Sequence, residues 1–415
     1  MKKKLKIGIF GLDRGAFFFP AIQKEGGEVV AFLEKDDKKI ENAKIRLQKI
    51  GENTDNIGIY KDFDQFIKHD MDCVLLANYY NEHAKYAIKC LENNVSVLSE
   101  TMSNATMAEG VALVRAVEKS KAKYMLLENY PFMKFNLEIK KVINGGTLGK
   151  PLYCEGEYNH PSHITTEHIR RYYGFDKHWR RFLPRTYYLT HALAPLMYIT
   201  GARPTRVCAL PIYHPDTNSA SMVGDIASIM TTINDDKSVF KFSGHTSYGY
   251  EENSYRFCCE KGQVQNCRGD ENKILVAYND WDIPEGKEKV NIYDAEWEEQ
   301  DKEIAAQLGH AGGDYFVIKN FFGLLRGENE NPYDVYFATT MASISILAHR
   351  SQIELGVPYD VPDFRKEDDR KKYENDYSTP FYDSDGGVPN IQCCSNKDYR
   401  PTEEALKNYY EMIKN

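Results

Sequence analysis

The chain has 415 residues, of which 42% are hydrophobic and 27% are charged, and its net charge is −8. This composition is ordinary for a globular protein, and the length exceeds that of one ordinary core, so we expect two domains and an extension. The acidic balance argues against nucleic acid or an anionic membrane as the main partner.

The sequence also predicts no membrane partner. No apolar run approaches the roughly 18 residues of a membrane span, and the lysines at 2–4 are not followed by the apolar core of a signal peptide. The nine cysteines form no C-x-x-C pair, and an odd count of this kind is typical of reduced thiols. We therefore predict a cytoplasmic location.

The first part of the chain alternates short apolar strands with helices. Such alternation predicts a parallel sheet covered on both faces, that is, an N-terminal Rossmann domain of the doubly wound α/β class over residues 1–128. Ser103 is the expected N-cap of the last helix. The predicted strands are 5–10, 28–34, 73–78, 95–99 and 124–129, and the predicted helices are 37–50, 82–93 and 104–120.

The pattern changes after residue 150, where longer alternating runs are joined by turn residues. These runs predict a C-terminal α+β domain, 129–365, built on a large, mainly antiparallel open sheet. Because an open sheet with an uncovered face usually needs a partner surface, we expect a homo-oligomer. The remaining residues, 366–415, are charged and irregular, which predicts a polar surface extension. The expected strands are 151–160, 225–234, 238–248 and 253–267, and the expected helices are 315–326 and 335–355.

The stretch "IGIFGLDRG" places glycines between the first strand and the first helix. Such a turn can bring the helix N-terminus against a pyrophosphate. Asp13 is unusual beside a phosphate, so we interpret it as the helix N-cap, with Arg14 as the compensating cation. Glu34 ends the second strand at about the 20-residue offset expected of a ribose-binding carboxylate, and a carboxylate there favours NAD over NADP. Lys35 beside it weakens that preference for NAD. The alternative to a bound dinucleotide is a Rossmann fold whose nucleotide site has degenerated.

Three stretches carry a resemblance to a known family: "IGIFGLDRG", "VVAFLEKD" and "EHAKYAIKCLENNVSVLSE". With them, residues 5–365 resemble the Gfo/Idh/MocA oxidoreductases. That resemblance implies a two-domain fold and an NAD-dependent reaction on a carbohydrate. The chain departs from the family at Glu100-Thr101-Met102, where Glu-Lys-Pro is usual and the lysine takes the proton from the hydroxyl being oxidised.

The second half is similar to a particular branch, the NAD-dependent glycoside hydrolases of family 109. The similarity lies in "YMLLENYPF", "GTLGKPLYCEGEYNH", "HWRRFLPRTYYLTHALAPLMYITG", "GHAGGDYFVIKNFFGLLRG" and "VPYDVPDF". Those enzymes also lack the lysine and use a glutamate, a tyrosine on the sheet and a Tyr-x-x-His element. The matching residues are Glu128, Tyr158, Tyr188 and His191, although Tyr187 stands beside Tyr188 and allows another register.

The resemblance implies glycoside cleavage by transient oxidation. The sugar hydroxyl at C3 becomes a ketone, the C2 proton is removed, the C1 group leaves, water adds and the hydride returns to C3. His191 or Tyr188 would take the C3 hydroxyl proton, and Tyr158 would be the base at C2. Pro195 places His191 near a helix N-terminus, whose positive end disfavours the imidazolium. Glu128 would bind sugar hydroxyls or the nicotinamide ribose.

The role of one further histidine is left open. His310 in "GHAGGD" either contacts substrate or stabilises a glycine turn, and Asp314 is expected to cap the following helix. His160 is expected to bind substrate. His163 and His168 lie close to it, but their irregular spacing argues against a metal site, so we predict none.

The sequence leaves two alternative functions open and predicts a set of cofactor contacts. A plain NAD-dependent sugar or cyclitol dehydrogenase is the first alternative to glycoside cleavage, and a non-catalytic regulator that holds the cofactor is the second. The residues expected to bind NAD are Gly11, Leu12, Asp13, Arg14, Gly15, Glu34, Lys35, Asn78, His83, Glu100, Trp179 and Arg180.

Overall fold

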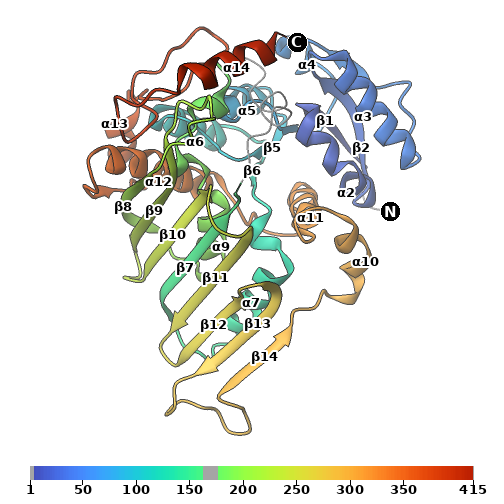
Figure 1. Ribbon diagram of the computed structural model, residues 1–415. Coiled ribbons are helices and arrows are strands. Elements are labelled where there is room, and N and C mark those ends of the chain that lie inside the picture. Colours follow the sequence, from blue (N-terminus) through green and yellow to red (C-terminus); the bar gives the residue numbers. More distant parts are fainter. Residues whose placement is uncertain (1–3, 162–175, 415) are drawn as a thin grey trace. The chain divides into compact units, whose positions relative to one another are not determined.

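The computed structural model describes residues 4–161 and 176–414, which fall into two compact units (Figure 1). The first unit combines the described residues up to Lys134 with Trp297–Thr339 and Phe364–Asn375. The second combines Phe135–Glu296 with Thr340–Asp363 and the residues from Asp376 on. Each unit contains segments from more than one of the three predicted domain ranges. The boundaries of those ranges stay predictions.

The first unit contains a parallel sheet of six strands within the described residues, in the order β3-β2-β1-β4-β5-β6. Strand order reverses at β1 and β4, which is the topology of the doubly wound Rossmann fold and confirms the predicted fold class. The central strands form because short apolar runs are buried on both faces. The strands are β1 (Leu5–Phe10), β2 (Gly27–Leu33), β3 (Gly58–Tyr60), β4 (Cys73–Leu76), β5 (Ser96–Glu100) and β6 (Tyr124–Leu127).

The helices of this unit follow the predicted alternation, with one corrected boundary. Helix α6 begins after Thr106, not after Ser103. The Thr106 hydroxyl accepts from the backbone of Glu109, whose carboxylate accepts from the backbone of Thr106, and this capping box fixes the start of the helix. The helices are α1 (Leu12–Gly15), α2 (Phe19–Lys24), α3 (Asp37–Lys49), α4 (Phe63–Phe66), α5 (His83–Glu92), α6 (Met107–Lys119), α10 (Glu299–Gln307), α11 (Gly313–Arg326) and α13 (Glu367–Tyr373).

The second unit contains a sheet of nine strands within the described residues, in the order β14-β13-β12-β11-β7-β10-β9-β8-β15. Its pairings are antiparallel except that of β7 with β10, which confirms the prediction of a mainly antiparallel open sheet. The strands are β7 (Pro151–Asn159), β8 (Pro204–Tyr213), β9 (Asp225–Asn234), β10 (Val239–Thr246), β11 (Glu252–Cys259), β12 (Gly262–Cys267), β13 (Asp270–Tyr278), β14 (Val290–Asp294) and β15 (Tyr359–Asp360).

Helix α9 (Thr190–Thr200) lies against β7 and β10 of this sheet (Figure 1). The approach is close at Gly156, where an added Cβ would lie 2.2 Å from the backbone oxygen of Ala192. The Tyr255 hydroxyl, from β11, donates to the backbone oxygen of His191 at 2.7 Å. These two contacts fix the first turn of α9 on the sheet. The other helices with residues in this unit are α7 (Lys134–Asn144), α12 (Val335–Ile353) and α14 (Glu403–Ile413).

The C-terminal extension is more ordered than the sequence indicates. We expected a charged, irregular surface segment, but it forms α13 in the first unit and α14 in the second. Phe381, Cys394 and Tyr409 are buried. The expectation of a surface position was therefore wrong for these residues, because scattered aromatic side chains bury themselves between charged stretches.

Two negative expectations can be compared with the structure. Among the described residues, no helix combines the length and the hydrophobicity needed to cross a membrane. Each of the nine cysteines lies in the described ranges and carries a free thiol.

Candidate active site

The loop between β1 and α1 forms a glycine turn at the carboxyl end of the sheet. Gly11 has a φ of 88°, and an added Cβ would lie 2.2 Å from the backbone oxygen of Ala77. The Leu12 N–H donates to the Glu34 carboxylate at 3.2 Å, and that carboxylate also accepts from the Lys35 N–H at 2.8 Å. Gly15 is buried in the same turn. The structure thus brings the predicted ribose-binding carboxylate beside the start of the first helix.

Asp13 does not cap this helix. Gly11 occupies the N-cap position, and the Asp13 carboxylate, 75% exposed, pairs with the Lys39 ammonium at 2.6 Å. The prediction that Asp13 is the N-cap was therefore wrong, and the compensating role of Arg14 beside a pyrophosphate stays a prediction. The reason is that α1 starts two residues earlier than an Asp13 cap requires, so the carboxylate points outward to α3.

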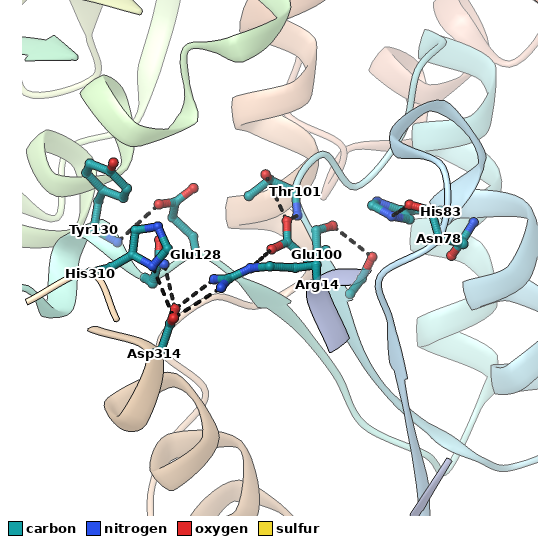
Figure 2. A network of polar contacts seen from close by, with 11 residues as sticks. Arg14, Asn78, His83, Glu100, Thr101, Glu128, Tyr130, His310 and Asp314 are labelled. Atoms are coloured by element: carbon teal, nitrogen blue, oxygen red, sulfur yellow. Dashed lines mark hydrogen bonds and ion pairs between the residues drawn. The ribbon is translucent and has the colours of Figure 1, made fainter. Parts of the chain in front are cut away.

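Arg14 takes part in a different network, shown in Figure 2. Its Nε donates to Glu100 at 2.9 Å, and its two terminal nitrogens donate to the two oxygens of Asp314 at 3.1 and 2.7 Å. Asn129 donates to the same Asp314 carboxylate at 2.7 Å. The network therefore links the first helix, the end of β5 and the start of α11 within one unit.

Asp314 is not the cap of α11, as the sequence suggested. Gly312 is the N-cap residue, and Asp314 lies in the first turn with its side chain 3% exposed. Burial alone would raise the pKa of this carboxyl, but the hydrogen bond from His310 and the charge of Arg14 hold it well below its usual range. Asp314 is therefore a buried carboxylate fixed by cationic partners.

His310 lies in a strained turn directly before α11. Its φ is 53°, its Nδ1 lies 3.1 Å from an oxygen of Asp314, and its side chain is 38% exposed. Because Asp314 is held as a carboxylate, Nδ1 carries the proton and Nε2 presents the other side of the ring. The Tyr130 ring lies beside it, with centroids 6.0 Å apart. Glu128 is completely buried and accepts from the Tyr130 N–H at 3.2 Å (Figure 2).

His83 and Asn78 lie at the neighbouring strand ends. The buried His83 ring meets two backbone oxygens: that of Met102 at 3.0 Å and that of Asn78 at 3.3 Å. Burial lowers the pKa of His83, so the ring is neutral. A neutral imidazole has one N–H, so His83 donates to one of these two oxygens and packs against the other, between the loops after β4 and β5.

Three predicted catalytic residues form one aromatic cluster in the second unit. The rings of Tyr158 and His191 meet nearly perpendicularly, with centroids 4.9 Å apart, and those of Tyr188 and His191 do so at 5.2 Å. Tyr158 and Tyr188 are 6.1 Å apart. Tyr158 comes from β7, Tyr188 ends the turn η5 (Arg185–Tyr188), and His191 is the second residue of α9. The helix-terminus position predicted for His191 from Pro195 is thus found in the structure.

The two adjacent tyrosines have different surroundings. Tyr187 is completely buried and packs against Phe381 and His349, whereas Tyr188 contacts His191. His160 stacks on Tyr158 at 5.5 Å and lies 3.0 Å from the Glu251 carboxylate. The structure therefore gathers His160 with the cluster and separates Tyr187 from it.

Trp179 and Arg180 also belong to the second unit. The Arg180 guanidinium lies over the Trp179 ring, 4.4 Å from its centroid. Their contact with a cofactor stays a prediction. Across the part of the chain that the structure describes, no group of three or more possible ligands could hold a metal ion. His163 and His168 lie outside the described residues.

Sequence reasoning missed several residues of these networks. Asp314 accepts hydrogen bonds from Arg14 and Asn129 across long sequence separations, and no local pattern indicates such contacts. Tyr255 holds the backbone of His191 but is one of 29 tyrosines, so nothing in the sequence distinguishes it.

Comparison with known proteins places this geometry in context. Residues 5–128 match the family described as "Oxidoreductase family, NAD-binding Rossmann fold" (Gfo/Idh/MocA), and residues 205–371 match "Glycosyl hydrolase 109, C-terminal domain". A glycosyl hydrolase family 109 protein of Shewanella putrefaciens is 22% identical over 398 residues, covering 87% of this chain and 85% of that protein. Its counterpart in Shewanella pealeana is 22% identical over 374 residues, covering 82% and 81%.

Solved structures share the fold. Levoglucosan dehydrogenase in complex with NADH has a TM-score of 0.71 at 15% identity, covering 87% of this chain and 100% of that one. UDP-N-acetylglucosamine 3-dehydrogenase from Acidithiobacillus ferrooxidans has a TM-score of 0.64 at 12% identity, covering 84% and 97%.

The fold, the glycine turn and the matching families together define an oxidoreductase that uses NAD. More particularly, residues 5–128 match the NAD-binding domain of the Gfo/Idh/MocA oxidoreductases, and residues 205–371 match the C-terminal domain of glycosyl hydrolase 109. The residues present fit the cofactor, because Gly11 permits the tight turn against the Ala77 backbone before the helix start, and Glu34 stands where a ribose hydroxyl would donate. The NAD prediction is confirmed by the family match.

Proposed function

We propose that this enzyme cleaves a glycoside by transient oxidation at C3, elimination across C2 and C1, addition of water and re-reduction. The observation that carries the proposal is the cluster of Tyr158, Tyr188 and His191. One imidazole in contact with two phenols can move protons at two neighbouring sugar carbons, and such a reaction needs that ability.

The cluster divides the proton transfers between its members. His191 or Tyr188 takes the proton of the C3 hydroxyl, and Tyr158 removes the proton at C2. Their origin on three different elements supports these roles, since each side chain is fixed separately by the sheet, the turn and the helix. When bound, NAD supplies the hydride acceptor at C3 and returns the hydride at the end.

The sequence at the end of β5 supports the same assignment. Thr101 stands where the resembling dehydrogenases have their proton-accepting lysine, and Glu100 is held by Arg14 at 2.9 Å and by the Thr101 N–H at 3.1 Å. Both oxygens of this carboxylate are thus engaged by donors of the first unit. The hydroxyl proton therefore goes to a group outside this strand end, and the Tyr188–His191 pair meets that requirement.

The first unit would hold the cofactor. Gly11, Leu12 and Gly15 offer the turn and helix start for the pyrophosphate, and Glu34 offers its carboxylate to the ribose. Glu100 ends β5, and Asn78 lies two residues after the end of β4. Each of these contacts is part of the proposal, as are those of Asp13, Arg14, Lys35, His83, Trp179 and Arg180.

Three residues would bind the sugar. His310 presents Nε2 because Asp314 holds its Nδ1, Glu128 offers a carboxylate at the end of β6, and His160 extends the aromatic cluster. Each can accept or donate a hydrogen bond to a hydroxyl, which suits a carbohydrate substrate.

A panel of aryl glycosides tests the proposed function. The purified protein is incubated with each glycoside, with and without added NAD, and both aglycone and NADH are measured. Aglycone release without net NADH is the expected result. Stoichiometric NADH with intact glycoside would instead establish a plain sugar dehydrogenase, and neither product with bound NAD would establish a regulator that holds the cofactor.

Two further predictions accompany this function. We expect a homo-oligomer, which light scattering on the purified protein would show as a mass that is a multiple of 47.8 kDa. We also expect the enzyme to work in the cytoplasm, which fractionation of cells that express it would test.

A further inference from the structure

The C-terminal segment Asp376–Lys414 is the subject of this inference. It lies beyond the residues matched by both family descriptions, which end at 128 and 371, and it belongs to the second unit. We propose that this segment positions the Tyr188–His191 pair, and that Phe381 is its principal positioning residue. The proposal rests on the proposed function, since it deepens the role of that pair.

The first connection runs through Tyr187. The rings of Phe381 and Tyr187 meet edge to face with centroids 5.2 Å apart, and His349 contacts the Tyr187 ring at 5.7 Å. The Nε2 of His349 lies 2.7 Å from the backbone oxygen of Gln392, so this second ring is held by the same segment. Tyr187 is completely buried and directly precedes Tyr188 in η5. The segment thus fixes the residue from which Tyr188 projects.

The second connection holds the beginning of the same turn. Both the N–H and the hydroxyl of Ser395 donate to the buried carboxylate of Asp225, the N–H at 2.8 Å. The backbone oxygen of Asp225 accepts from Arg185 at 2.9 Å, and Arg185 is the first residue of η5. A serine of the segment therefore fixes the strand residue to which η5 is anchored.

The third connection lies in η4 (Trp179–Phe182), just before η5. The buried Arg181 guanidinium lies 4.5 Å from the centroid of Tyr409 on α14. Phe182 meets the ring of Tyr382 at 5.1 Å, one residue after Phe381. Aromatic and cation–π contacts of this kind are directional, so they fix orientation as well as distance.

The three connections define what the segment does. They contact η4, the strand residue that anchors the first residue of η5, and the residue before Tyr188. Helix α9 with His191 begins two residues after Tyr188. Helix α9 is held to the sheet by the hydrogen bond from Tyr255. The contacts that hold η5 include the ring contact of Phe381 and the hydrogen bond from Arg185 to Asp225. Loss of Phe381 would leave α9 in place and let Tyr188 move away from His191.

The test measures the exposure of His191 without any substrate. In the full-length protein, peptide mass spectrometry follows the rate at which diethyl pyrocarbonate modifies His191, which is 9% exposed, with the exposed His214 as an internal reference. We expect Phe381→Ala to raise the His191 rate about tenfold relative to His214, because the turn that covers it opens locally. Phe381→Leu, which restores apolar volume, should return most of the protection. Tyr377→Ala, at an exposed position of the same segment, is the matched control and should behave as wild type.

A second readout separates positioning from general destabilisation. On a glycoside found active in the panel, Phe381→Ala should lower kcat while the affinity for NADH is unchanged. If Phe381→Ala does not fold, Ser395→Ala, which keeps the volume and removes one donor to Asp225, carries the same test. A folded Phe381→Ala or Ser395→Ala protein with the wild-type His191 rate would overturn the proposal. The rate of His191 modification is measured without catalysis. It can therefore support the positioning role of the segment even if no aryl glycoside is cleaved.

Discussion

The rings of Tyr158 and His191 meet at an angle of 88° with their centroids 4.9 Å apart. The tyrosine comes from the central strand β7 and the histidine from the first turn of α9, and Gly156 on the same strand allows that turn to approach the sheet. This contact places a phenol and an imidazole within reach of one ligand.

Removal of the imidazole should stop turnover without disturbing the cofactor. For His191→Ala we expect kcat to fall by at least about 100-fold, the scale of general acid–base catalysis, with NADH affinity nearly unchanged. Steady-state kinetics and NADH fluorescence titration measure the two quantities. His214→Ala, at an exposed position in the same unit, is the control and should match wild type. Unaltered turnover in His191→Ala would remove this residue from the proposed mechanism.

Glu34 should determine the choice of dinucleotide. Glu34→Gln removes the charge that would accept from a ribose hydroxyl and repel a 2′-phosphate, so we expect NADH to bind about tenfold more weakly and NADPH to bind relatively better. Titration calorimetry with both dinucleotides measures this change. Glu41→Gln, at an exposed position on α3, should leave both affinities as they are. Equal affinities in Glu34→Gln and wild type would show that the ribose lies elsewhere.

Asp314 should be important for the stability of the first unit. Asp314→Asn removes one of the two carboxylates that hold the Arg14 guanidinium and leaves Glu100, so we expect a loss of about 2 kcal/mol in the free energy of unfolding. The exposed pair of Lys89 and Asp64 offers the control: Asp64→Asn should change stability by less than about 1 kcal/mol. Urea denaturation of the two variants compares them, and an equally small loss in both would contradict the structural role of Asp314.

His349 should make stability depend on pH. Burial lowers its pKa to about 4 from 6.5, with a further lowering by Arg350 that the backbone oxygen of Gln392 partly opposes. The unfolded chain therefore binds a proton first as the pH falls, so this contribution is complete above about pH 7 and is lost between about pH 6.5 and 4. The full loss corresponds to about 3 kcal/mol.

The variant His349→Gln tests that dependence. Glutamine keeps an amide donor near Gln392 but does not titrate, so the fall in unfolding free energy between pH 7 and pH 5 should be smaller than in wild type. Denaturation at a series of pH values gives both slopes. Parallel slopes would show that other groups cause the pH dependence.

Local sequence signals identified much of the fold and part of the site. Short apolar runs predicted the parallel strands, because burial on both faces leaves no polar alternation. Glu34 could be placed from its position at a strand end, and His191 from Pro195, because both signals act within a few residues.

The errors came from contacts between distant residues. Asp13 and Asp314 both follow glycines before a helix, which is typical of N-caps, yet one pairs with Lys39 and the other with Arg14. Such pairing depends on which elements meet in three dimensions, and spacing along the chain does not reveal it. The C-terminal segment was misjudged for the same reason, since Phe381 is buried by Tyr187, which lies far away in sequence.

Solvent deuterium at C2 of the sugar tests the central claim most directly. Turnover of an active glycoside in heavy water should release a sugar that carries one deuterium at C2, because in the proposed mechanism Tyr158 removes that proton and solvent supplies its replacement. Mass spectrometry and proton NMR of the product locate the label. A released sugar that keeps its original hydrogen at C2 would contradict cleavage by oxidation and elimination.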